Sequence, residues 1–254
     1  MIDTHCHLYD EAFAEEEDEA VARALEAGVS ALVLPDIDSR SRGAMSALAA
    51  RHPGVAFPCA GLHPTEVGEG WKEEYELAEQ FARKEKVVAI GEIGIDLYWS
   101  REFACQQKAV FGMQLDLACE LDLPVIIHNR EATEVVLEEV RKHNRSNLRG
   151  VLHAFTGSVE TAREFGRMGD WYFGIGGVVT FKKASIGETV KELPLDRILL
   201  ETDCPYLTPV PFRGHRNESS YLPYIAATIA SKLGKDISEV DEITSANARR
   251  LFGI

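Results

Sequence analysis

The sequence of 254 residues has no long hydrophobic run. No stretch approaches the ~18 consecutive apolar residues of a membrane span, so neither a membrane protein nor a membrane partner is expected. Near the start, acidic residues crowd Glu11–Glu19, where a secretory signal would carry a basic segment and then an apolar one. These absences predict a cytoplasmic protein.

Cysteine pairs in CxxC spacing are also missing. The five cysteines are an odd number scattered along the chain, which is usual for reduced thiols and predicts no disulfide. Linkers rich in proline or serine and low-complexity segments are absent too. Because this length fits one large domain, we expect a single domain over residues 1–254, with no obligate protein partner.

Positive charge is scarce. The chain has 27 Lys and Arg against 41 Asp and Glu, a net charge of −14. This argues against a protein that coats long nucleic acids by general electrostatics. An enzyme that takes a strand end or a small phosphate ester into a local site stays open, because bound cations would add positive charge.

The chain does contain eight short apolar runs that alternate with amphipathic segments. The runs are Ile2–Leu8, Ala31–Pro35, Ala56–Gly61, Val87–Ile95, Pro124–His128, Val151–Phe155, Trp171–Gly176 and Ile198–Thr202. Helical spacing is clearest in Glu15–Ala27, which ends at Gly28, and in Phe103–Leu121, Ala132–Lys142 and Tyr221–Leu233. Apolar strands separated by helices predict a covered parallel sheet. Eight such repeats predict an α/β fold of the (β/α)8 TIM-barrel class; a doubly wound sheet is the alternative, but no GxGxxG opens a helix.

The step His5-Cys6-His7 lies in the first of these runs. Because side chains alternate along a strand, the two imidazoles would share one face and could grip one divalent ion. Cys6 would then point to the opposite face, which argues against it as a ligand. The alternative interpretation is one partly buried histidine beside an exposed one.

Other polar residues fall where the predicted strands end, and these ends meet on one face of a barrel. They are His5, His7, His63, Glu92, His128, His153 and Asp203. His52 and His143, by contrast, fall at helix ends or in loops. Four of these histidines (all but His63) and the two carboxylates suffice for a pair of divalent ions with one bridging carboxylate. We expect one or two ions among zinc, magnesium, manganese and nickel, although magnesium prefers more oxygen ligands.

Seven motifs together resemble the TatD-related metal-dependent deoxyribonucleases of the amidohydrolase-like barrels. They are Asp3-Thr4-His5-Cys6-His7, Gly61-Leu62-His63-Pro64, Gly91-Glu92-Ile93-Gly94, Val125-Ile126-Ile127-His128, His153-Ala154-Phe155-Thr156-Gly157-Ser158, Glu201-Thr202-Asp203-Cys204-Pro205 and Pro211-Phe212-Arg213-Gly214-His215-Arg216-Asn217-Glu218. The resemblance implies a TIM barrel that hydrolyses phosphodiester bonds of DNA with divalent metals, acting as a 3'-5' exonuclease on single strands or strand ends.

The resemblance also implies roles for these residues. His5 and His7 would hold the first metal with Asp203, Glu92 would bridge the ions, and His128 with His153 would hold the second. Asp203 would be the general base, since a carboxylate that touches both metal and water can take the attacking proton. His63 would contact a phosphate oxygen or donate a proton to the leaving group; its alternative is a polar residue of the turn.

Two departures from the family pattern are visible. His215 stands where related sequences usually carry lysine, so any charge there would depend on pH, with an ordinary imidazole pKa of ~6.5. Asn129 stands before Arg130, where a serine or cysteine is commoner.

Several side chains are candidates for substrate contact. Arg130, Arg213 and Arg216 could clamp phosphate oxygens, and ion pairing with the many acids is the alternative. Tyr98 and Trp99 could stack on a nucleobase at the pocket rim, although packing under a loop is favoured. Phe181, Lys182 and Lys183 could contact a nucleic-acid backbone, although a solvated loop is favoured.

Two neighbours of Asp203 complete the expectations. Glu201 could hydrogen-bond a histidine ligand, with a buried salt bridge as the alternative. Cys204 should face away from the metals.

Two other functions are considered. An acyl or amide hydrolase, such as a deacylase or lactonase, is the alternative enzyme. Many related barrels bridge their metals with a carboxylated lysine at the fourth strand, whereas here that strand offers Glu92 and Lys86 precedes it. A barrel that only binds a partner is the third, but a degenerate enzyme would have lost ligands and none is missing.

Overall fold

The computed structural model describes all 254 residues, Met1 to Ile254, and contains eight parallel strands. Each strand overlaps one of the eight predicted runs. They are β1 Ile2–Asp3, β2 Ala31–Leu34, β3 Ala56–Pro58, β4 Ile90–Asp96, β5 Val125–Arg130, β6 Gly150–Leu152, β7 Trp171–Ile175 and β8 Ile198–Leu200. The first strand is much shorter than predicted, because regular pairing with β2 covers only Ile2 and Asp3.

The strands pair in sequence order, as β1-β2-β3 and as β4-β5-β6-β7-β8. Backbone hydrogen bonds join these two sets. At the first junction Ala60 N–H donates to Ala89 O, and Gly91 N–H donates to Ala60 O. At the second, Thr4 N–H donates to Leu200 O over 3.0 Å. The strands therefore close into the predicted TIM barrel.

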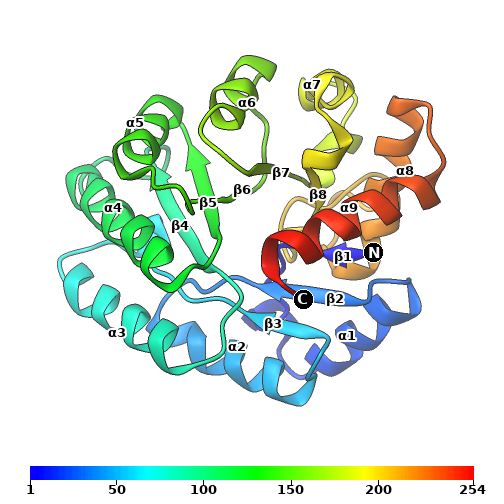
Figure 1. Cartoon of the computed structure of the whole chain (residues 1–254). Coiled ribbons are helices and arrows are strands. Elements are labelled where there is room, and N and C mark those ends of the chain that lie inside the picture. Colours follow the sequence, from blue (N-terminus) through cyan, green and yellow to red (C-terminus); the bar gives the residue numbers. More distant parts are fainter.

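Nine helices follow the strands and surround them (Figure 1). They are α1 Glu17–Glu26, α2 Ser39–Arg51, α3 Trp71–Lys84, α4 Ala104–Leu121, α5 Thr133–His143, α6 Val159–Gly166, α7 Ile186–Glu192, α8 Leu222–Leu233 and α9 Ile237–Phe252. The four helices predicted from spacing agree within two residues at each end. Gly28 follows α1 with a φ of 86°, a conformation that glycine adopts freely. No helix is long and apolar enough to cross a membrane.

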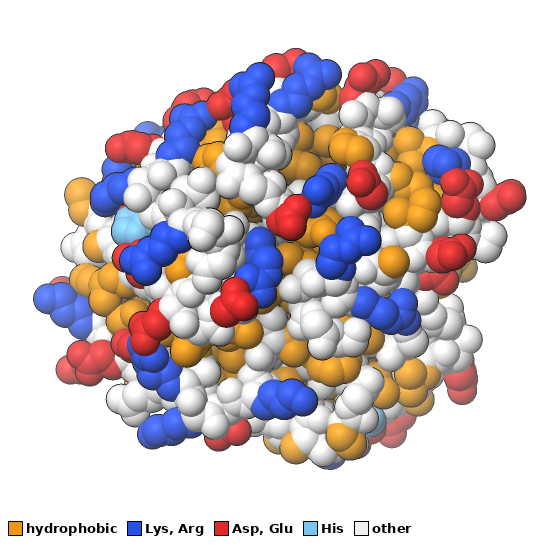
Figure 2. Space-filling model, in the orientation of Figure 1, with side chains coloured by type: hydrophobic (Ala, Val, Ile, Leu, Met, Phe, Trp, Pro, Cys, Tyr) orange, Lys and Arg blue, Asp and Glu red, His pale blue; other side chains and the backbone are white.

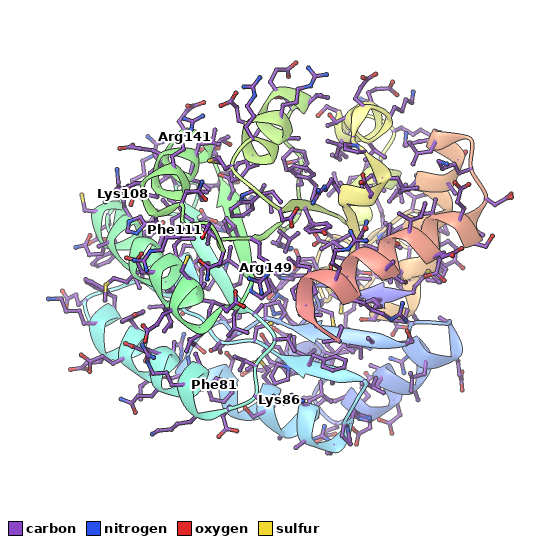
Figure 3. All side chains as sticks on the ribbon, viewed as in Figure 1. Phe81, Lys86, Lys108, Phe111, Arg141 and Arg149 are labelled. Carbon is purple, nitrogen blue, oxygen red and sulfur yellow. The ribbon has the colours of Figure 1, made fainter.

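Two apolar layers hold the barrel together. The outer layer lies between strands and helices and includes Phe111 on α4, which points inward while Lys108 and Arg141 point outward (Figure 3). The inner layer joins strand residues such as Ile126 and Val151 to Leu251 and Phe252 of α9. That last helix, which spacing did not predict, thus closes the end of the barrel from which the strands begin.

The face seen in Figure 2 carries charges of both signs side by side, with apolar side chains between them. No large region of this face bears one sign of charge. This face, over which α9 lies, therefore offers no extended positive patch.

The inner layer also determines where polar residues gather. Ile126 and Val151 point into the barrel, and because side chains alternate along a strand, His128 and His153 point the same way two residues later. They lie above the inner layer, at the end where the strands finish. This end carries the candidate site.

Candidate metal centre

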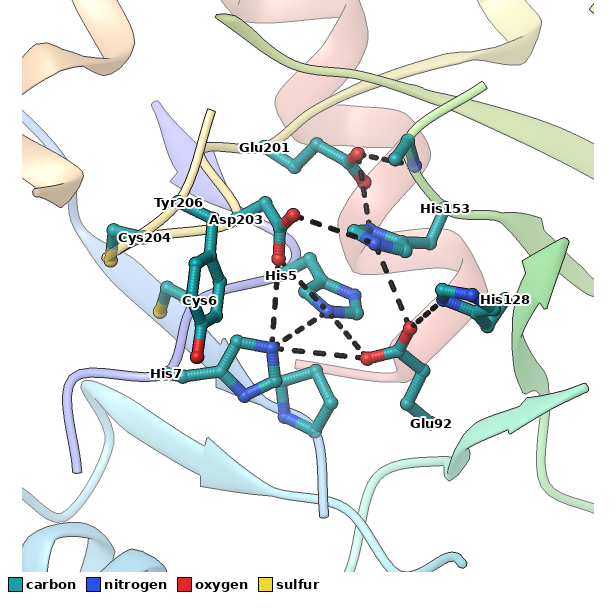
Figure 4. Close-up of polar contacts among 12 residues, drawn as sticks. His5, Cys6, His7, Glu92, His128, His153, Glu201, Asp203, Cys204 and Tyr206 are labelled. Atoms are coloured by element: carbon teal, nitrogen blue, oxygen red, sulfur yellow. Dashed lines mark hydrogen bonds and ion pairs between the residues drawn. The ribbon is translucent and has the colours of Figure 1, made fainter. Parts of the chain in front are cut away.

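His5 and His7 lie beyond the regular part of β1, where the backbone still bonds to both neighbouring strands. Cys6 N–H donates to Val33 O over 3.1 Å, and His7 N–H donates to Cys204 O over 2.8 Å. The two imidazoles converge, with their Nε2 atoms 3.1 Å apart (Figure 4). Cys6 lies on the other side, in the outer apolar layer. This placement agrees with the prediction that the Cys6 thiol is not a metal ligand.

Glu92 of β4 is buried at the centre of the site and uses its two oxygens differently. Oε2 lies 3.1 Å from Nε2 of His5 and 3.8 Å from Nε2 of His7. Oε1 lies 2.8 Å from Nδ1 of His128 and 3.7 Å from Nε2 of His153. One carboxylate thus faces two separate sets of imidazoles, which is the orientation that a bridging ligand needs.

Asp203 follows β8 and completes the cluster from the opposite wall. Its φ of 58° is a left-handed conformation that aspartate tolerates better than most residues. Oδ1 lies 3.7 Å from Nε2 of His5 and 3.6 Å from Nε2 of His7. Oδ2 lies 3.9 Å from Nε2 of His153. The backbone turn therefore aims the carboxylate at three imidazoles.

Three histidines have a second partner that orients the ring. Nδ1 of His7 lies 2.8 Å from the hydroxyl of Tyr9, which itself donates to Pro35 O. That hydroxyl therefore accepts from Nδ1–H and leaves Nε2 of His7 bare toward the centre. Nδ1 of His153 lies 3.2 Å from Glu201 Oε1.

His128 is held in the same manner by Asp96, whose Oδ2 lies 2.9 Å from its Nε2. Partners of this kind fix the tautomer and orientation of metal-ligating histidines. Glu201 lies within ion-pair distance of His153, and the hydrogen bond that it accepts comes from Ala154 N–H.

Sequence reasoning missed Asp96 and Tyr9. A signal for each was present, because Asp96 lies four residues after Glu92 on one strand and Tyr9 two residues after His7. A polar side chain this close in sequence to a predicted ligand can reach the same site and orient that ligand. Side chains at these distances are therefore candidates for partners of a ligand.

Electrostatics keeps the carboxylates of the site ionised. Burial raises the pKa of Glu92, but His63, His5 and His153 outweigh it and lower that pKa well below its usual range. Burial also raises the pKa of Asp203, and His153 foremost outweighs it, so the net pKa is lowered. Buried carboxylates that stay charged require cationic partners.

The imidazoles are divided between neutral and charged forms. Burial foremost, and then His153, lower the pKa of His5 to about 4, so its lone pair is free at neutral pH. Burial lowers the pKa of His153, but Glu201 foremost and then Glu92 outweigh it and raise the pKa to about 10. For His128, bonds to Asp96 and Glu92 outweigh burial and raise the pKa to about 8.

The donors fit divalent ions. Three groups have ligand atoms within 4.8 Å of one another: His5, Glu92 and His153; His5, His7 and Asp203; and His63, Glu92 and His128. Imidazole and carboxylate donors suit zinc, manganese and nickel. Neighbouring imidazole nitrogens 3.1 Å apart, beside an ionised carboxylate, are the arrangement that a shared cation satisfies. The residues present therefore fit the metals that the sequence motifs imply.

His63 contacts this cluster, at the end of the barrel where its sequence position placed it. Its Nε2 is 3.3 Å from Glu92 Oε1 and 3.3 Å from Nδ1 of His128. On the other side of the ring, Nδ1 accepts the backbone N–H of Thr65 over 3.2 Å. His63 is thus both part of the turn and in contact with the site.

The three arginines of the rim differ in their partners. Arg216 bonds Glu16 and the carbonyl of Ala12 and stacks on Phe13, which agrees with the ion-pairing alternative. Arg213 is exposed and lies 4.1 Å from the centre of the Phe181 ring. Arg130 is exposed and stacks on Tyr98.

The remaining candidates are placed as follows. Tyr98 and Trp99 are 50% and 69% exposed, so the favoured prediction that they pack under a loop is wrong. Their rings contact each other and the guanidinium of Arg130 instead. Lys182 and Lys183 are exposed, as in a solvated loop, and so is His215.

Cys204 is buried beside Ser219, with a sulfur-to-oxygen distance of 3.7 Å, and points away from the imidazoles (Figure 4). His52 pairs with Asp18 and His143 with Asp116, both at helix ends.

With this geometry established, comparison with known proteins identifies the family. The sequence model of the TatD related DNase family matches residues 2–253. The chain belongs to this family. A metal-dependent hydrolase of Bacillus subtilis, YabD, whose function is given as uncharacterized, is 40% identical over the whole chain and 99% of its own length. The 3'-5' ssDNA/RNA exonuclease TatD of Klebsiella pneumoniae is 36% identical over the whole chain and 98% of its own length.

Solved structures agree with the TatD fold. The crystal structure of YjjV, a TatD homolog of Escherichia coli, superposes with a TM-score of 0.90 at 29% identity, covering 100% of this chain and 98% of that one. The protein is therefore a metal-dependent hydrolase of the TatD family, as the motifs predicted, and an enzyme that acts on ester bonds.

Proposed function

We propose that this protein hydrolyses phosphodiester bonds of single-stranded DNA from the 3' end with divalent metals. The observation that carries the proposal is Glu92, whose Oε2 faces His5 and His7 while its Oε1 faces the other imidazoles. A relative 36% identical over the whole chain is named a 3'-5' ssDNA/RNA exonuclease, which supports the strand and its direction.

The proposed metal ligands are those inferred from the motifs. His5 and His7 would hold one ion with Asp203, His128 and His153 would hold a second, and Glu92 would serve both. Ions held there would supply the positive charge that hydrolysis of a phosphodiester needs. Tyr9, Asp96 and Glu201 keep the rings turned so that one nitrogen of each faces the centre.

Asp203 is the proposed general base. The lowered pKa keeps its carboxylate ionised at neutral pH, so it can accept a proton from the attacking water. A carboxylate positioned for this transfer contributes roughly 10²–10⁴-fold to the rate.

His63 is proposed to contact the phosphate. Burial foremost lowers its pKa, so the ring is neutral at neutral pH. Nδ1 contacts both the N–H and the hydroxyl of Thr65, and in the tautomer with its proton on Nε2 the ring can donate to a phosphate oxygen. A neutral ring favours this hydrogen bond over proton donation to the leaving group.

Arg130 and Arg213 are the proposed clamps for further phosphates, because each is exposed and stacks on an aromatic ring without a carboxylate partner. Arg216, which is bonded to Glu16, is proposed to order its loop and through it the approach to the site. A planar guanidinium can bind phosphate through two parallel hydrogen bonds.

A strand-cleavage assay tests the proposal. Protein stripped of metal and reloaded with manganese, magnesium, zinc or nickel is incubated with 5'-labelled single strands of DNA or RNA. We expect a ladder that shortens from the 3' end, and at least ~10²-fold slower cleavage by Asp203→Asn. Asparagine tolerates the positive φ of position 203, so the variant should fold. A circular dichroism spectrum equal to that of the wild-type protein is the control.

An ester and amide panel in the same assay separates the alternative enzyme. Turnover of an acyl ester or lactone, with no shortening of any strand under any metal, would move the assignment to the acyl hydrolases. Undiminished strand cleavage by Asp203→Asn would show that another group is the base.

A further inference from the structure

Two large aromatic side chains stand in solvent beside the metal centre. Trp99 is 69% exposed and Tyr98 50% exposed, in the segment that follows β4. Their rings meet edge to face, with 5.0 Å between centroids. Trp99 is the most exposed of the large hydrophobic side chains. Exposure of this kind costs free energy that burial would recover, which points to an aromatic surface kept for a ligand.

The loop that carries them is tied directly to a histidine of the centre. Asp96 Oδ1 accepts the backbone N–H groups of Tyr98 over 3.0 Å and Trp99 over 3.1 Å. Its other oxygen, Oδ2, lies 2.9 Å from Nε2 of His128. One buried carboxylate therefore fixes both the imidazole and the backbone from which the tryptophan projects.

A cation completes the surface. The Arg130 guanidinium lies 3.9 Å from the centre of the Tyr98 ring and 5.2 Å from that of Trp99. It has no carboxylate partner within 4.0 Å, although acids outnumber bases by 14 in this chain; neighbouring Arg101, for comparison, pairs with Glu131. An aromatic plane beside a free guanidinium matches the two parts of a nucleotide, base and phosphate.

We propose that Trp99 is the stacking platform for an unpaired nucleobase of the strand being cleaved, with Arg130 holding a phosphate of the same strand. This inference rests on the proposed function and adds the residue that selects single strands. A base inside a duplex has neighbours on both faces, so its plane cannot reach the indole. Stacking is sequence-tolerant because every base has an aromatic face.

The test compares strands with and without a base at the 3'-terminal nucleotides. Stacking on one aromatic side chain is worth roughly 5- to 150-fold in affinity. We expect the wild-type protein to prefer the base-bearing strand over the abasic strand by a factor in this range in kcat/KM. Trp99→Ala should bring the ratio toward one, and Trp99→Phe should retain part of it.

Tyr224→Ala is the matched control, because Tyr224 is also exposed, at 43%, but lies on α8. Its ratio should equal that of the wild-type protein. An unchanged ratio in Trp99→Ala, or an equal loss in Tyr224→Ala, would overturn the inference.

A binding measurement without metal separates this inference from the proposed function. A short phosphorothioate oligothymidylate, added in the presence of chelator, should quench the tryptophan fluorescence of the wild-type protein and not that of Trp99→Phe. Trp171, only 1% exposed, and Trp71, partly buried at the start of α3, give the background signal that Trp99→Phe retains. If no strand is cleaved but this quenching occurs, the proposed function fails and the stacking site stands. Equal quenching in both proteins, or none, refutes the stacking site whatever the cleavage assay shows.

Discussion

At the scale of single residues, the site is organised around carboxylates that each serve two groups. Glu92 faces two sets of imidazoles, and Asp96 joins His128 to the loop of Trp99. Glu201 bonds Ala154 N–H over 2.6 Å while Oε1 also faces His153. Each buried charge therefore fixes the relative position of two elements.

The substitution Glu201→Gln tests whether the contact of Glu201 with His153 supports metal binding. The amide cannot supply the negative charge that now faces His153, so the ring loses its strongest electrostatic partner. We expect the affinity for zinc or manganese to fall roughly 10- to 100-fold, as for other partners of metal-bound histidines. Calorimetric titration of the stripped protein measures the change.

Glu139→Gln is the control for that measurement, because Glu139 is equally buried at 1% but pairs with Lys108 on the helical layer. Its metal affinity should match that of the wild-type protein. Equal affinity in Glu201→Gln would mean that Glu201 acts only as a backbone acceptor.

At the scale of elements, close approach between neighbouring strands positions the ligands. A Cβ added to Gly174 of β7 would lie 2.0 Å from Oε2 of Glu201. The carboxylate of Glu201 thus occupies the space that a side chain at position 174 would need. Gly43, in the exposed interior of α2, has no neighbour within 4 Å of such an atom.

These two glycines predict opposite results. Gly174→Ala should lower the free energy of unfolding by roughly 1–3 kcal/mol, the cost of overpacking, and weaken metal binding by displacing Glu201. Gly43→Ala should raise the free energy of unfolding by roughly 0.5–1 kcal/mol, because alanine loses less conformational entropy than glycine when it enters a helix. Urea unfolding of both variants gives the two values; stabilisation by Gly174→Ala would contradict the packing described.

Strand alternation also explains which ligands could be predicted. On β5 and β6 the inward Ile126 and Val151 precede His128 and His153 by two residues, so periodicity aims both rings correctly. On β4 the pairing register shifts between Ile90 and Ile93, so the direction of Glu92 does not follow from alternation. A bulge depends on how the neighbouring strand fits, which local sequence does not reveal.

At the scale of the whole molecule, the buried anions make metal and fold interdependent. Binding of an ion at 100 times its dissociation constant stabilises the native state by ~2.7 kcal/mol. For a chain of this size, 1 kcal/mol shifts the melting temperature by ~2–4 °C. Chelation should therefore lower the melting temperature by ~5–10 °C, as differential scanning fluorimetry can measure.

A variant with both His5→Ala and His7→Ala supplies the control for chelation. It lacks two proposed ligands, so its melting temperature should change less on adding chelator. An identical shift in the variant would place the stabilising ion elsewhere.

The acidic surface predicts a weak dependence of strand binding on salt. Each phosphate neutralised on a single strand contributes ~0.7 to the slope of log affinity against log salt. Arg130→Gln should therefore reduce the magnitude of that slope by ~0.7, measured with a non-cleavable phosphorothioate strand. Arg51→Gln, which changes an arginine paired with Glu17 and Asp18 on α2, should leave the slope unchanged.

The sequence by itself determined the order of the eight strands, four of the helices, the barrel class and the metal chemistry. These depend on local periodicity and on residue types at strand ends, which are properties of short segments. His5-Cys6-His7 already indicated two ligands and a cysteine behind them.

Only the tertiary structure decided how the ends of the strands face one another. It turned the chain so that His5 and His7 face Glu92, brought Asp96 against His128, and left Trp99 in solvent beside Arg130. The physical reason is that each of these arrangements is a contact between segments far apart in the chain or a backbone irregularity, and neither is encoded in the pattern of one segment.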